Sequence, residues 1–138
     1  MDNKDMIKLL QQDLGREYEA MNFYLQCSFS VRGYRRGYLK GWLREQATEE
    51  LGHAIQIADK IASLGGVPTT TIPAVQGLTD AVEILRHALT YELAVVKNFK
   101  QRAADADKLG DVHLRLLLEE QLAESQGEAE EIRKLLEH

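Results

Sequence analysis

Proline placement is the sequence feature that most limits how this chain can fold. The only two prolines, Pro68 and Pro73, lie close together, and the long stretches on either side contain none. Proline breaks a helix interior because it lacks a backbone N–H and clashes with the preceding turn, so both stretches are free to form long helices. Within them, apolar residues recur at the three- and four-residue spacing of amphipathic helices. The sequence therefore predicts an all-α protein.

Four apolar stripes, at residues 10–25, 39–64, 82–99 and 114–135, predict four helices. Short glycine-containing turns at residues 33–37 and 105–111 join the first two and the last two helices as antiparallel neighbours. The connection at residues 65–79 is longer, ends near a predicted N-cap at Thr79 or Asp80, and can cross the length of a bundle. We therefore expect a four-helix bundle of two antiparallel hairpins joined by a long crossover, in one domain spanning residues 1–138.

Composition disfavours several classes of function. The formal net charge of −5 argues against a nucleic-acid-binding surface, which needs lysine and arginine to neutralise phosphates. Cys27 is the only cysteine, so no internal disulfide is expected, and no apolar run approaches the roughly 20 residues of a membrane span. The N-terminus does not resemble a signal peptide, so we expect a cytoplasmic protein without nucleic-acid or membrane partners. The ending Leu136-Glu137-His138 resembles the beginning of a purification tag, and we assign no function to His138.

A glutamate in the middle of three apolar stripes indicates the function. Glu17, Glu50 and Glu92 each occupy a position where the helical spacing requires an inward side chain. Burying an ionised carboxylate costs several kcal/mol unless it is paired, and no lysine or arginine occupies these stripes at that level. A bound metal ion is the simplest way to neutralise the three charges.

Sequence spacing places these carboxylates at one height in the bundle. Measured from a turn near residue 35, Glu17 lies 18 residues before it, and Glu50 and His53 lie 15 and 18 residues after it. At about 1.5 Å of rise per residue the three share one level, and the i,i+3 pair Glu50 and His53 projects from one helix face. Carboxylates with one imidazole suit iron or manganese, with zinc as a further alternative. Glu17, Glu50, His53 and Glu92 are therefore candidate metal ligands and catalytic residues.

An internal repeat extends this set to the fourth helix. In the first hairpin, Glu50 and His53 follow the helix-one glutamate by 33 and 36 residues. The same distances counted from Glu92 reach Ser125 and Glu128, which continue the fourth stripe. The chain thus consists of two related hairpins, in which the second Glu-x-x-His pair has become Ser-x-x-Glu. Glu128 is the predicted metal ligand of the fourth helix.

Two further residues leave alternatives open. Glu124 competes with Glu128 as the ligand, but it falls off the stripe, on a polar strip with Gln121 and Glu131. We expect its removal to have no effect on metal binding. Tyr24 is expected to pack in the core or to donate a hydrogen bond from its hydroxyl to a ligand carboxylate.

Three segments resemble the metal-binding motifs of bacterioferritins and of the wider ferritin-like di-iron family. Residues 17–24, Glu-Tyr-Glu-Ala-Met-Asn-Phe-Tyr, are similar to the helix-one motif of that family. Residues 50–54, Glu-Leu-Gly-His-Ala, are similar to its helix-two motif, and residues 93–99 follow Glu92 as in its third helix. The resemblance extends from about residue 8 to residue 135 and implies a ferritin-like four-helix bundle.

This resemblance also implies a function and a role for each ligand. Family members oxidise Fe(II) with dioxygen or peroxide at a di-iron ferroxidase centre, and some store iron in hollow shells. By resemblance, Glu17 and His53 bind the first iron, Glu50 bridges, and Glu92 binds the second iron. The implied partners are Fe(II), dioxygen or peroxide, and further copies of the chain in a homo-oligomer.

Three departures from the family pattern modify these expectations. The helix-four Glu-x-x-His of the family falls on Ser125 and Glu128, so one carboxylate is absent and the second iron position is altered. The methionine that binds haem in bacterioferritins is Leu51 here, so no haem is expected. The chain ends with its fourth helix, without the short fifth helix of 24-subunit shells, so twelve-subunit cages and dimers become alternatives to a large shell.

The leading hypothesis is a haem-free, iron-binding ferroxidase with a role in iron storage or detoxification. One alternative is another iron or manganese oxidoreductase, such as a peroxidase, on the same bundle. The other is a non-catalytic helical assembly protein with a degenerate metal site, and Ser125 is the feature that favours it.

Overall fold

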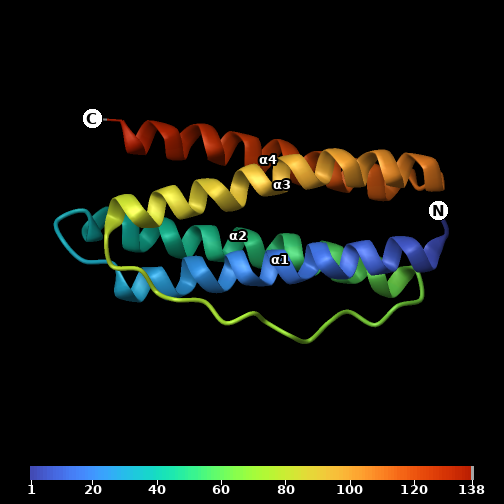
Figure 1. The fold of residues 1–138 in the computed structure, drawn as a ribbon, viewed down its shortest axis with the longest axis horizontal. Helices are drawn as coiled ribbons and strands as arrows, with labels where there is room; N and C mark the ends of the chain where they lie inside the picture. The colour runs from blue at the N-terminus through green and yellow to red at the C-terminus, as the bar shows by residue number, and fades with distance from the viewer. Residues whose placement is uncertain (138) are drawn as a thin grey trace.

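The computed structural model describes residues 1–137, which form four helices and no strand. The helices are α1 (Asn3–Ser30), α2 (Arg36–Ser63), α3 (Ala81–Leu109) and α4 (Val112–Leu136). α1 packs mainly against α2, and α3 packs mainly against α4, as two antiparallel hairpins (Figure 1). The predicted all-α bundle is confirmed, whereas the tag-like residue His138 lies outside the described residues. None of the helices described is long and apolar enough to cross a membrane.

Aspartate caps and a glycine determine where the helices begin and end. Asp2 forms a reciprocal capping box with Asp5 at the start of α1. Asp80, one of the two predicted N-caps, accepts a hydrogen bond from the backbone N–H of Glu83 at 3.0 Å and begins α3. Gly110 ends α3 with a left-handed φ of 79°, a conformation that favours glycine.

α3 extends further than the sequence predicts. The expected break at residues 105–111 is wrong, because α3 continues to Leu109 and only Gly110 and Asp111 separate it from α4. Asp105 remains helical and buried because Nη1 of Arg102 donates a hydrogen bond to its Oδ2 at 2.9 Å. Nε of Arg102 also donates to Oδ2 of Asp13 in α1 at 2.7 Å. Polar residues that resemble a loop in the sequence therefore join α3 to α1.

The crossover between α2 and α3 runs the length of the bundle beside α1 (Figure 1). The side chains of Gln11, Asn22 and Ser30 donate hydrogen bonds to backbone carbonyls of the crossover at 2.6 to 3.0 Å. These bonds satisfy part of a backbone that has no regular structure of its own. The crossover is thereby fixed along α1, as the long-crossover prediction requires.

Two apolar clusters form the core, one on each side of a polar level. One cluster contains Leu43 and Leu85, and the other contains Leu14, Ile57 and Leu118. Between the two clusters the inward side chains are polar and almost completely buried. Because close-packed apolar side chains fix the helices above and below, the polar level is held at defined distances.

Candidate metal centre

Glu17, Glu50 and His53 converge at the polar level. Each offers one ligand atom, and the three atoms lie within 4.8 Å of one another. Nδ1 of His53 lies 3.7 Å from Oε2 of Glu50 and 3.9 Å from Oε2 of Glu17. The equal heights on α1 and α2 that residue counting predicts are therefore present in the structure.

Two carboxylate oxygens of this cluster have no hydrogen-bond partner. Glu17 is 2% exposed and Glu50 is 3% exposed, and Oε2 of each is buried and unpaired. Among residues 1–137, no lysine or arginine forms an ion pair with either carboxylate. An unpaired buried carboxylate oxygen is costly, and a cation would satisfy both at once. Two carboxylates and one imidazole form a suitable donor set for iron or manganese.

Protons compensate for part of this charge when no cation is bound. Burial and the charge of Glu50 raise the pKa of Glu17 well above its usual value. Burial opposes ionisation of Glu50, but the nearby Glu17 carboxyl group and the charge of His53 lower its pKa. Burial lowers the pKa of His53, but the nearby carboxylates of Glu50 and Glu124 raise it to about 9. A metal ion must displace these protons as it binds.

Glu92 approaches the same level from α3. It is 1% exposed, and the Tyr24 hydroxyl donates a hydrogen bond to its Oε1 at 2.8 Å. Tyr24 therefore combines core packing with the hydrogen bond that the sequence left as an alternative. Burial, followed by the charge of Glu50, raises the pKa of Glu92 to about 8. Glu92 is consequently protonated at neutral pH unless a cation faces it.

The fourth helix contributes a weaker set of donors. Ser125 is 1% exposed, and its hydroxyl lies beside Glu92 without a well-aligned hydrogen bond. Glu128 is half-buried, and the Gln46 side chain of α2 lies within hydrogen-bonding reach of it. Among the described residues, only Glu17, Glu50 and His53 converge as a three-ligand set. Glu92 and Glu128 lie nearby but outside that set.

Glu124, which the sequence ranked below Glu128 as a ligand, makes the direct contact from α4 with the His53 ring. Its Oε2 lies 2.5 Å from Nε2 of His53 and accepts a hydrogen bond from the ring. Gln121, expected on a polar strip with it, is 1% exposed and donates to the backbone carbonyl of His53 at 3.3 Å. Both residues contact His53, although the Glu124 side chain is half-exposed, as its position off the apolar stripe predicts. A usable signal existed, because a histidine that binds metal through one nitrogen usually donates its other N–H to a carboxylate or carbonyl.

Comparison with known proteins decides the family. Residues 7–138 match the family model of the ferritin-like domain. The chain belongs to the ferritin-like family. The bacterial non-heme ferritin of Bacteroides fragilis is 26% identical over 136 residues, which cover 91% of this chain and 84% of that protein. The resemblance predicted from the sequence motifs is confirmed.

Solved ferritin-like structures share the whole architecture. A ferritin-like, diiron-carboxylate protein from Bacillus anthracis str. Ames is 34% identical, with a TM-score of 0.93 over 99% of both chains. A dodecameric thioferritin, the bacterioferritin-related protein of Bacteroides fragilis, is 24% identical, with a TM-score of 0.87 over 99% of this chain and 86% of that one. These likenesses confirm the ferritin-like four-helix bundle, and family membership supports an iron-binding, ferritin-type function.

Proposed function

We propose that this ferritin-like protein binds Fe(II) at Glu17, Glu50 and His53 and oxidises it, as a haem-free ferroxidase in iron storage or detoxification. The observation that supports this most directly is the pair of buried, unpaired carboxylate oxygens beside Nδ1 of His53. The relation to a diiron-carboxylate protein at 34% identity agrees with it.

The residues of α1 and α2 would hold the first iron. Glu17 and His53 would bind it, and Glu50 would extend toward the second position. Glu124 accepts the Nε2–H of His53 and so directs the Nδ1 lone pair toward the metal. All three members of the cluster, Glu17, Glu50 and His53, come from α1 and α2.

The second iron position would rest on weaker donors. Glu92, oriented by the Tyr24 hydroxyl, and Glu128 would supply carboxylate oxygens there. Ser125 contributes a neutral hydroxyl where a Glu-x-x-His motif has a carboxylate, and no imidazole faces this position from α4. We therefore expect the second iron to bind more weakly than the first.

Ferroxidase chemistry at this site balances as an exchange of electrons and protons. Two Fe(II) ions lose one electron each, and dioxygen takes up the two electrons with two protons to form hydrogen peroxide. If peroxide is the oxidant, it takes up two electrons and two protons to form two molecules of water. The anionic oxygens of Glu17 and Glu50 favour the more highly charged Fe(III), because the attraction between opposite charges grows with the charge on the ion.

An anaerobic Fe(II) titration followed by oxygen would test this function. Uptake of two irons per chain with rapid oxygen consumption is the expected result. One tightly bound iron with slow oxidation would indicate that serine in place of glutamate at position 125 impairs the second iron site. No metal uptake would contradict the metal assignment and favour the helical assembly protein.

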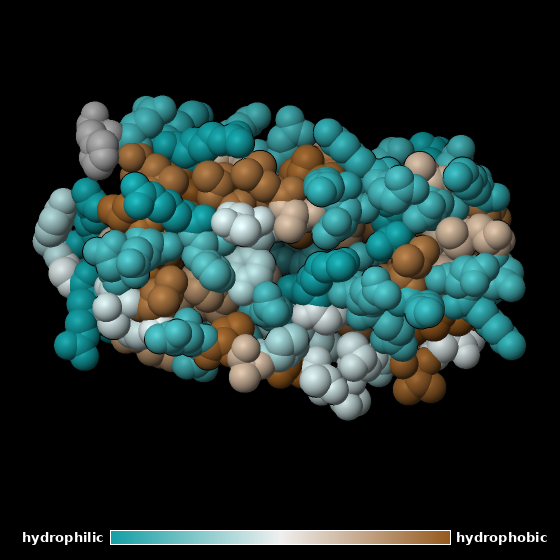
Figure 2. All heavy atoms as spheres, viewed as in Figure 1, coloured by the Kyte–Doolittle hydropathy of each residue, from teal (hydrophilic) through white to brown (hydrophobic). Residues whose placement is uncertain are grey.

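We also propose that the chain assembles into a homo-oligomer, as the dodecameric thioferritin does. Large apolar side chains remain exposed on the outer surfaces of α1 and α2, namely Leu25, Phe29, Leu51 and Ile55. Arg44 of α2 lies over the Phe29 ring of α1 at 5.4 Å, so the two helices contribute to one surface. The face in Figure 2 carries many polar side chains together with a band of apolar ones at its upper left. Sedimentation velocity would distinguish a monomer from a dimer or a cage.

A further inference from the structure

A cavity of about 340 Å³ opens between α1 and α3 and reaches the metal centre. Its surface is mostly apolar and includes the small side chains Ala20, Ala94 and Val95. Glu50 and Glu92, which are 3% and 1% exposed, also line it. The cavity thus reaches Glu50, the residue whose Oε2 has no hydrogen-bond partner.

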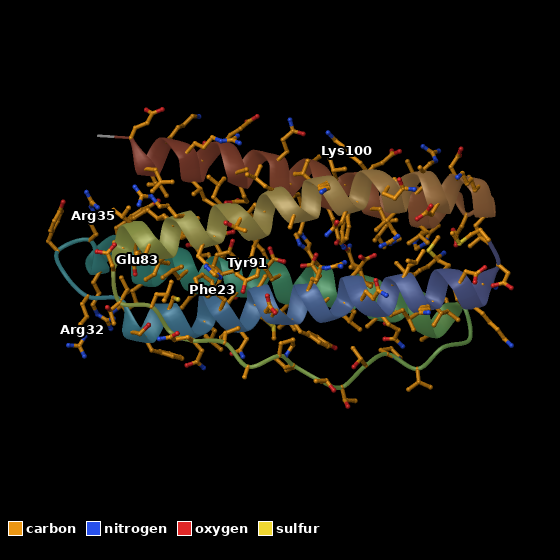
Figure 3. The ribbon with its side chains drawn as sticks, in the orientation of Figure 1. Phe23, Arg32, Arg35, Glu83, Tyr91 and Lys100 are labelled. Atoms are coloured by element: carbon orange, nitrogen blue, oxygen red, sulfur yellow. The ribbon has the colours of Figure 1, made fainter. Side chains whose placement is uncertain are left out.

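The cavity has an aromatic neighbour on the α3 side. Tyr91 lines it, and its ring packs against Phe23 of α1 with centroids 5.3 Å apart. Figure 3 shows both side chains between α1 and α3. Aromatic and aliphatic groups thus form most of the surface near the Glu50 and Glu92 carboxyl groups, and the polar side chains Arg16, Glu19 and Thr90 also line the cavity.

A second opening, between α2 and α4, has the opposite chemistry. This groove of about 730 Å³ is lined by His53 and by five glutamates, Glu49, Glu124, Glu128, Glu130 and Glu131. No lysine or arginine is among its lining residues. The groove is open beside Gly52 and Gly127, because a Cβ at either position would meet no atom within 4 Å.

The two openings lie on opposite sides of the bundle. α1 borders α2 and α3, and α4 also borders α2 and α3, so the α1/α3 and α2/α4 sides face away from each other. A groove lined with carboxylates concentrates cations near its mouth. An apolar cavity offers a hydrated cation no replacement for its water, but such cavities admit small neutral molecules such as xenon.

We infer that the two reactants reach the metal centre from opposite sides, Fe(II) through the acidic α2/α4 groove and dioxygen through the apolar α1/α3 cavity. This inference rests on the proposed function. Dioxygen fits the cavity better than hydrogen peroxide does, because peroxide needs hydrogen-bond partners that a mostly apolar surface lacks. Cation loading and oxidation therefore do not compete for one passage.

Matched alanine-to-phenylalanine variants separate the two routes. Ala94→Phe narrows the α1/α3 cavity, Ala123→Phe narrows the α2/α4 groove, and Ala104→Phe on the exposed surface of α3 is the control. Co(II) binding without oxygen, followed by absorbance, measures cation entry. Mixing Fe(II)-loaded protein with dissolved oxygen measures the oxidant step.

We expect Ala94→Phe to slow oxidation several-fold with the Co(II) binding rate unchanged, and Ala123→Phe to slow Co(II) binding alone. Ala104→Phe should change neither rate. Added salt should slow Co(II) binding but not oxidation of the loaded protein. Oxidation that is slowed by Ala123→Phe and not by Ala94→Phe would overturn the inference.

Xenon provides a readout that is independent of activity. In xenon-pressurised crystals, xenon should occupy the α1/α3 cavity of the unmodified protein and be absent from Ala94→Phe and from the second plug, Thr90→Phe. An empty cavity in the unmodified protein would overturn the inference. If Fe(II) is bound but not oxidised, the proposed function fails while xenon and Co(II) still report whether the two routes exist.

Discussion

At the scale of single residues, Glu50 combines two properties that oppose each other. Its carboxylate is buried with one oxygen unpaired, which is unfavourable for folding, and the same oxygen is what a metal ion requires. Sites that bind or react often carry such a cost in stability. The isosteric change to glutamine separates the two properties.

We predict that Glu50→Gln abolishes tight Fe(II) binding and raises the melting temperature of the metal-free protein. The amide keeps the shape but removes a negative charge from a cluster of carboxyl groups. Isothermal titration without oxygen and thermal unfolding in the presence of a chelator measure the two effects. Glu45→Gln, at an exposed position of α2, is the control and should leave both unchanged. Unaltered iron affinity in Glu50→Gln would rule this residue out as a ligand.

Glu124 leads to a second prediction, which reverses the expectation drawn from the sequence. Because its carboxylate holds Nε2 of His53, Glu124→Ala should weaken metal binding by about 10- to 100-fold, as loss of an outer-shell partner typically does. Glu120→Ala, at another exposed position of α4, should bind metal normally. Competition with a coloured chelator would compare the two variants. Equal affinities would restore the view that Glu124 is dispensable.

These residues show how far the sequence could predict the site. Counting residues from one turn correctly placed Glu17, Glu50 and His53 together, since two straight helices of constant rise preserve equal heights. The position of Glu124 depends instead on how α4 is rotated against α2. A stripe of apolar residues defines that rotation only to within a broad sector, so the spacing could not show that the half-exposed Glu124 reaches His53.

At the scale of elements, a buried charge network links α1 to α3. Arg102 donates to Asp13 across the helices and to Asp105 on its own helix, and all three are at most 7% exposed. The sequence indicated a loop near Asp105, because clustered aspartates usually mark turns. Arg102 pairs with Asp105 within α3 and also with Asp13 of α1, which is distant in the sequence. The spacing of apolar residues along one helix cannot predict an ion pair with a residue that is distant in the sequence.

We predict that Arg102→Ala destabilises the protein by about 3–5 kcal/mol, because it leaves buried carboxylates uncompensated. Arg16 also pairs with Asp13, but its side chain is 51% exposed, so Arg16→Ala should cost at most about 1 kcal/mol. Urea unfolding followed by circular dichroism would measure both. Similar small losses in the two variants would show that Arg102 is not needed to neutralise Asp13.

At the scale of the whole molecule, protons and metal ions compete to neutralise the buried carboxylates between the two apolar clusters. The pKa of Glu92 rises from 4.5 to about 8, and that of His53 rises from 6.5 to about 9. Both groups hold a proton more tightly in the folded than in the unfolded chain. Their contribution to stability is therefore fully present at low pH and is lost as pH rises through the folded-state values. Glu50, whose pKa is lowered, acts in the opposite sense, but only in the acid range.

We therefore predict that the melting temperature of the metal-free protein falls as pH rises from about 6.5 to about 9, the interval between the ordinary pKa of a histidine and the pKa of His53 in the folded protein. Bound metal replaces these protons, so the increase in melting temperature produced by Mn(II) should grow over the same interval. Calorimetric scans with a chelator and with excess Mn(II) would measure this. Glu92→Gln should flatten the metal-free profile, because its amide cannot titrate. If the stabilisation by Mn(II) is constant over this interval, protons and metal ions do not compete for the buried carboxylates between the two apolar clusters.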